Sequence, residues 1–206
     1  NLDFSAVFYG IEIPGPKPAL LRDSPLRIDG NLRLDENDRP IHFAIHHPLI
    51  NVEGSGTTGD KVGGRINLKL PDLKPIASVA DLDLRGSTDL NLRAASEGGI
   101  IKLDLTGGLA VTGGMAPVPG LVGDRGKIDL SLVIRGEEMT LSHLRFNGRT
   151  LDLSADGRIP GKDSDLRFDV ALSDLSVLAP RFSGYLNAQG KVQGKPDNLA
   201  LSTDLN

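Results

Sequence analysis

The stretch Leu26–Leu34, with the sequence LRIDGNLRL, decides the fold class because its apolar and polar residues alternate. In an extended chain Leu26, Ile28, Leu32 and Leu34 point to one face, and the charged residues point to the other. Strict alternation of this kind predicts a half-buried β-strand. One wet face and one dry face are typical of antiparallel sheets.

The same alternation returns along nearly the whole chain, whereas helical periodicity is almost absent. Only two short helical turns are predicted, at 72–79 and 174–179, the second with Ser173 or Asp174 as its N-cap. We expect the apolar residues of the alternating runs to share one face and to line an apolar groove. These residues are Leu26, Ile28, Leu32, Leu34, Ile66, Leu68, Leu70, Leu84, Leu90, Leu92, Ile101, Leu103, Leu105, Ile128, Leu130, Leu132, Leu151, Leu153, Phe168, Val170, Leu172, Leu186, Val192, Leu199 and Leu201.

An internal repeat organises the chain. The pattern Pro-x-Pro-x-Leu-(Leu/Val)-x-Asp occurs at 16–23 and again at 117–124, 101 residues further on. The matches that follow keep nearly the same spacing. We therefore expect one elongated β-repeat domain over 1–206. It would contain the tail of a preceding repeat (1–15), repeat unit one (16–116) and an incomplete unit two (117–206), with about six strands in each unit.

Three architectures can bury the dry face of such a sheet: a sandwich, a closed barrel, or a curled, half-open trough. Aromatic residues make up only 4% of the chain and Trp is absent, whereas hydrophobic residues make up 39%. A compact core usually has more aromatic bulk, and an outer-membrane barrel has aromatic girdles. The composition and the tandem repeat therefore favour an all-β fold with one long, curled antiparallel sheet around an apolar interior.

Composition excludes several classes of function. The net charge of −4 argues against nucleic acid as a partner. The absence of cysteine rules out disulfides and cysteine-based metal or redox sites. No apolar run is long enough for a membrane-spanning helix, and no signal peptide is present. Because strand-like patterns run into both ends, we expect the chain to be a fragment of a longer protein.

No constellation of catalytic or metal-binding residues stands out. His42, His46 and His47 form the only histidine cluster, but two histidines four residues apart on a strand are about 13 Å apart, too far for one metal ion. We interpret them, and the isolated His143, as surface residues. The carboxylates are spread evenly, and no phosphate-binding loop or nucleophile elbow is present. The sequence therefore predicts no enzyme, no metal and no cofactor.

The chain resembles the TamB family of Gram-negative envelope proteins and the wider AsmA-like group. One segment that supports the resemblance is Leu141–Ile159, with its order of strand, turn glycine, strand and closing glycine. Another runs from Phe168–Ala179 through Gly184 and Gly190–Gly194 to Asn198–Leu201, with its order of strand, short helical turn and further strands. The resemblance covers nearly the whole chain, but it is one of pattern, because no catalytic signature defines the family.

Membership of this family would imply a long periplasmic protein that is anchored in the inner membrane and folded as a β-taco, a sheet curled around an apolar groove. It would also imply a BamA/TamA-class outer-membrane partner that contacts regions outside this fragment. The expected function is passage of phospholipid or another acyl-chain lipid between the two membranes. The alternative is a scaffold or chaperone for outer-membrane protein clients, including autotransporters. A structural or adhesive β-repeat fits the broad leucine stripe least well.

Overall fold

The computed structural model describes residues 1–12, 17–34, 37–59, 62–159, 164–195 and 198–205. Its strands form a single sheet of 13 strands in which each strand pairs antiparallel with the next one along the chain. The strands are β1 (Leu2–Phe8), β2 (Leu26–Leu32), β3 (Pro40–His47), β4 (Ile50–Thr58), β5 (Val62–Leu70), β6 (Leu84–Glu97), β7 (Ile100–Gly114), β8 (Gly126–Arg135), β9 (Glu138–Asn147), β10 (Leu151–Ile159), β11 (Ser164–Leu172), β12 (Leu186–Lys195) and β13 (Asn198–Leu205).

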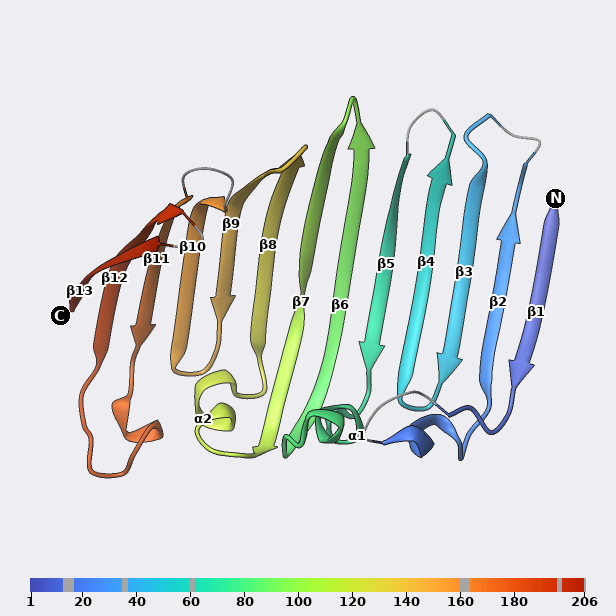
Figure 1. Ribbon diagram of the computed structural model, residues 1–206. Helices are drawn as coiled ribbons and strands as arrows, with labels where there is room; N and C mark the ends of the chain where they lie inside the picture. Colours follow the sequence, from blue (N-terminus) through green and yellow to red (C-terminus); the bar gives the residue numbers. More distant parts are fainter. Residues whose placement is uncertain (13–16, 35–36, 60–61, 160–163, 196–197, 206) are drawn as a thin grey trace.

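The sheet is open, because its order runs from β1 to β13 and these two strands do not pair with each other. Figure 1 shows one extended layer in which β13 is strongly slanted relative to the central strands. The expected all-β fold with a long antiparallel sheet is confirmed, and the closed barrel is excluded. At about 4.8 Å between neighbouring strands, the sheet is roughly 58 Å wide.

Short helical turns connect some of the strands, and Figure 1 shows them at one end of the sheet, which we call the helical end. The sequence predicted two such turns, and the described residues contain more, because the two Pro-rich segments also turn. Proline fits the first turn of a helix since it needs no N–H donor there. The turns are η1 (Pro18–Leu21), α1 (Leu73–Ala77) continued by η2 (Ser78–Ala80), α2 (Val118–Val122) and η3 (Leu175–Val177).

The order of elements in the first half of the chain recurs in the second half. A helical turn, four strands, another helical turn and two strands run from η1 to β7, and the same series runs from α2 to β13. The turns α1 and η3 begin alike. Asp72 accepts a hydrogen bond from Lys74 N at 2.9 Å, and Asp174 accepts one from Ser176 N at 2.8 Å. Residues 13–16, at the predicted start of unit one, lie outside the described residues.

Asp174 is therefore the N-cap, and not Ser173. Hydrogen bonds from the Ser176 side chain and then from its backbone N–H lower the pKa of Asp174. A carboxylate that accepts hydrogen bonds in this way is stabilised in its charged form. The shift has a local structural cause at a helix start, and it gives no indication of acid–base chemistry.

Candidate functional site

One face of the sheet is apolar across its whole width. In an antiparallel ladder, directly opposite residues lie on the same face, so the pairing register places each side chain. Leu103 on β7, for example, lies opposite Ala94 on β6 and Leu132 on β8. One row of neighbours from β3 to β9 consists of Ile41, Gly56, Gly64, Ala94, Leu103, Leu132 and Leu141.

The register assigns nearly all of the predicted groove residues to this apolar face. Leu34 is the exception, because β2 ends at Leu32 and the Leu34 side chain is 62% exposed. Leu199 and Leu201 lie in β13, but their side chains are outside those that the structure describes. Whether the remaining residues contact lipid stays a prediction.

Much of the apolar face has no cover. The accessible surface of the chain is 13221 Å², whereas a compact monomer of 21.9 kDa is expected to expose about 9,300 Å². Most of the groove residues are only half-buried. Aliphatic side chains that stay in contact with water contribute little free energy to folding, because little of their apolar area is removed from water. This face therefore has the properties of a surface that a ligand covers.

The burial of the apolar side chains differs between the two halves of the chain. All of the hydrophobic side chains that are buried belong to α2 or to strands between β7 and β12. No apolar side chain of β1–β6 reaches the same degree of burial among the described residues. The first half of the sheet therefore presents the more open apolar surface. The buried residues are Val111, Val122, Leu141, Ala155, Leu172 and Ala188.

The helical turns account for part of this asymmetry. Val122 of α2 and Val111 of β7 are both buried, and Val111 N donates a hydrogen bond to Gly123 O at 2.6 Å. A methyl group at Gly120 of α2 would lie 3.1 Å from Val177 Cβ, so α2 and η3 lie close together. These two turns close the helical end of the apolar face beneath the second half of the sheet.

A hollow of about 380 Å³ opens in the less covered half of the sheet. Gly56, Gly64 and Ala94 are consecutive neighbours in one row, and their small side chains leave this space. Larger apolar side chains surround it, including Phe43 and Ile101. The hollow thus offers an aliphatic lining in which the backbone groups already take part in the sheet ladder.

Phenylalanine rings cover glycines on this face, a feature that the list of expected groove residues did not anticipate. At three places a ring lies over the glycine of the next strand, so that a methyl group on that glycine would overlap the ring. Such pairing of an aromatic residue with a cross-strand glycine fills the gap in a sheet. The pairs are Phe4 with Gly30, Phe43 with Gly54, and Phe168 with Gly190. Phenylalanine and glycine at opposite positions of neighbouring strands are the sequence signal.

The opposite, outer face is a ladder of polar pairs between neighbouring strands. Its contacts join exposed or half-buried side chains, so each contributes little to stability. These polar pairs nevertheless identify the outer face as the face of the sheet that contacts solvent. Among them are Ser5 Oγ–Asp29 Oδ1 (2.6 Å), Asn67 Nδ2–Asn91 Oδ1 (2.9 Å), His143 Nε2–Asp129 Oδ1 (3.0 Å), Asn147 Nδ2–Asp152 Oδ1 (2.8 Å) and Arg167 Nη2–Asp156 Oδ2 (2.7 Å).

The histidines do not form a site. His42 and His46 are exposed on the outer face, as expected. The surface interpretation is wrong for His47, which is only 5% exposed and accepts a hydrogen bond from Leu49 N through Nδ1 at 3.1 Å. His47 shares the parity of Ile45 along β3, so it belongs to the apolar face. No group of three potential metal ligands occurs among the described residues.

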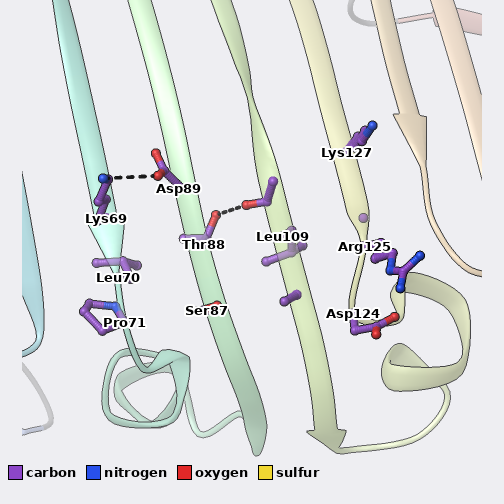
Figure 2. Close-up of a pocket in the computed structure, with 13 residues that line it drawn as sticks. Lys69, Leu70, Pro71, Ser87, Thr88, Asp89, Leu109, Asp124, Arg125 and Lys127 are labelled. Carbon is purple, nitrogen blue, oxygen red and sulfur yellow. Dashed lines mark hydrogen bonds and ion pairs between the residues drawn. The ribbon is translucent and has the colours of Figure 1, made fainter.

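A depression of about 590 Å³ lies between β5 and β8, and it does not concentrate reactive groups. Figure 2 shows its charged side chains. Lys69 Nζ lies 3.5 Å from Asp89 Oδ2, and Asp124 Oδ1 lies 3.6 Å from Arg149 Nη2. Arg125 points away from β7 in this view. The apolar face, and not this depression, is therefore the candidate site.

Comparisons with models of protein families, with curated proteins and with solved structures gave no match. None of the helices in the described part of the chain is long and apolar enough to cross a membrane.

Proposed function

We propose that the apolar face holds the acyl chains of phospholipid and conducts them along the sheet, as a periplasmic segment of a TamB-like protein. This proposal rests on the continuous apolar face of the sheet. Over β1–β6, most of that face is not covered by other described parts of the chain. The periplasmic location, the anchor in the inner membrane and the BamA/TamA-class partner rest on the sequence resemblance.

The chemistry of the face favours an acyl chain over a polypeptide. Burial of each methylene contributes about 0.8 kcal/mol without requiring a particular direction, so a lipid could slide between equivalent positions. A polypeptide would have to bury its own N–H and C=O groups. The hollow beside Gly64 offers few partners for them, because the strand backbones there already pair with each other.

The alternative, a scaffold for outer-membrane protein clients, would use an open strand edge by β-augmentation. Such a role needs exposed edges and no broad apolar face. Because the larger uncovered feature is the face, lipid passage is the better supported of the two functions. Substitutions on the face should therefore impair function more than substitutions that block an edge.

A vesicle assay tests the proposal on the purified chain. Donor vesicles contain a pyrene-labelled phosphatidylcholine, and acceptor vesicles do not. We expect the chain to extract labelled lipid and to accelerate its transfer by about tenfold or more, since an apolar groove lowers the cost of leaving the bilayer. A folded chain that extracts no lipid and leaves the transfer rate unchanged would refute the proposal.

A further inference from the structure

Arg65 on β5 and Arg93 on β6 lie directly opposite each other on the outer face of the sheet, and we call them the arginine pair. Both side chains are exposed. Directly opposite residues of an antiparallel pair have Cβ atoms about 5 Å apart, and like charges at such positions destabilise the strand pair. Both strands have paired neighbours on either side (Figure 1), so the arginine pair lies inside the sheet and not at an edge.

The arginine pair differs from the other like-charged pair that lies directly opposite on described strands, Arg167 and Lys191. In that second pair a carboxylate relieves the repulsion, because Asp156 Oδ2 lies 2.7 Å from Arg167 Nη2. Within the part of the chain that the structure describes, neither Arg65 nor Arg93 forms an ion pair or a side-chain hydrogen bond. The sheet therefore retains a repulsion here that a bound anion would relieve.

The carboxylates nearest in the register flank the arginine pair on its outer sides. Asp104 on β7 lies opposite one arginine, and Glu53 on β4 lies diagonally from the other. Among the described residues, neither carboxylate forms an ion pair. Towards the hairpin loops, Gly63 and Ala95 are the next residues on the same face. No long side chain from these two positions fills the space beside the two guanidinium groups.

Further hydrogen-bond donors lie beside the arginine pair. Asn67 Nδ2 donates to Asn91 Oδ1 at 2.9 Å, which leaves the Nδ2 group of Asn91 as a donor next to the arginines. Ser55 on β4 lies directly opposite Arg65, and its hydroxyl group can donate as well. This part of the outer face thus offers two cations and additional donors to an anion with several oxygen atoms.

We propose that the arginine pair binds a phosphate monoester dianion. A guanidinium group holds two phosphate oxygens in a bidentate contact. Two guanidinium groups match the charge of a phosphate monoester, about −1.5 to −2 at pH 7, whereas a phosphodiester carries a single negative charge. The site lies on the face opposite the apolar groove, so the inference goes beyond the lipid proposal and does not depend on it.

An NMR titration of the purified chain with inorganic phosphate, at constant ionic strength, tests the site through the Nε–H signals of Arg65 and Arg93. We expect saturable shifts with a dissociation constant in the millimolar range, because the site is exposed and screened. Arg93→Gln should weaken binding at least about tenfold, since it removes hydrogen bonds to a charged group. The matched control, Arg145→Gln, removes the same charge from the outer face, where Arg145 lies opposite Asp129. The control should bind phosphate like the wild type.

Urea unfolding followed by circular dichroism gives a second readout and shows whether the variants fold. A ligand that binds only the folded state stabilises that state. Phosphate at millimolar concentration should therefore raise the unfolding midpoint of the wild type and of Arg145→Gln more than that of Arg93→Gln.

Vesicles identify the source of the phosphate. Phosphatidylcholine vesicles with phosphatidic acid present a monoester, and vesicles with the same fraction of phosphatidylglycerol present a diester. Stronger binding to the phosphatidic acid vesicles, lost in Arg93→Gln, would assign the site to a lipid head group. Binding of inorganic phosphate without this preference would assign it to a soluble phosphate ester. The proposal is overturned if phosphate causes no saturable shift at Arg65, or if Arg93→Gln and Arg145→Gln weaken binding equally.

Discussion

We expect Leu103→Asp to weaken phospholipid binding about 30-fold, with the sheet still folded. Leu103 is half-buried on the apolar face, next to Ala94 and the hollow. A carboxylate at this position stays hydrated while the face is empty, but an acyl chain would strip it of water. Losing even about 2 kcal/mol of binding free energy to this desolvation corresponds to roughly 30-fold in affinity.

The control for this variant is the neighbouring Lys102→Asp. Lys102 is exposed on the outer face, opposite Val133, and its replacement changes the net charge by more than Leu103→Asp does. It should bind lipid like the wild type. The measurement is a titration with pyrene-labelled phosphatidylcholine, whose zwitterionic head group limits general charge effects. Equal affinities for the wild type and a folded Leu103→Asp variant would contradict the proposal that phospholipid binds to the apolar face.

The second large effect concerns stability. Gly86→Ala should lower the free energy of unfolding by about 3 kcal/mol, the upper end of what most single substitutions cost. Gly86 has φ = +149° at the register shift between β6 and β7. A methyl group there would overlap the carbonyl oxygen of Ala110. Because that atom belongs to a paired strand, the sheet itself would have to move.

Gly98→Ala is the matched control. Gly98 also has a positive φ, +58°, but an added methyl group would meet nothing within 4 Å. The conformational cost alone, about 1 kcal/mol, is expected. Urea unfolding followed by circular dichroism compares the two variants. A Gly86→Ala variant as stable as Gly98→Ala would contradict the expected clash with the Ala110 carbonyl oxygen.

Period-two alternation was sufficient to predict the class of the fold and the face of most groove residues. The reason is that a strand alternates its side chains by geometry alone. Leu34 receives no face from the register, because the alternation continues in the sequence beyond the last paired residue, Leu32. Alternation cannot show where pairing ends, since that depends on the neighbouring strand.

His47 was wrong for a different reason. Its chemical type suggested the surface, whereas its position, two residues after Ile45, indicated the apolar face. The structure follows position: His47 is buried, and its Nε2 has no hydrogen-bond partner among the described residues. Buried imidazole nitrogens usually have hydrogen-bond partners. Residue type alone therefore favours a surface position for histidine, and this expectation fails for His47.

The unequal burial of the two halves was not predictable from the repeat, because both units share one hydrophobic pattern. In the second half, the N–H groups of Arg149 and Thr150 donate to Leu121 O at 2.9 and 3.2 Å and hold α2 against the sheet. The repeat spacing puts Pro48 in the place of Arg149. Proline has no N–H to donate, so the hydrogen bond that Arg149 makes to α2 cannot form at Pro48, and the N–H of the next residue, Leu49, donates to His47 Nδ1.

Photo-cross-linking in cells tests the central claim most directly, with the photoreactive residue at Leu103 and, as a control, at Lys102. These neighbouring residues lie on opposite faces of β7. The two probe positions therefore differ in the face of the sheet that they sample, while their place along the strand is nearly the same. The account predicts phospholipid attached at position 103 and none at position 102. Labelling at neither position, or equally at both, would contradict an apolar face that carries lipid.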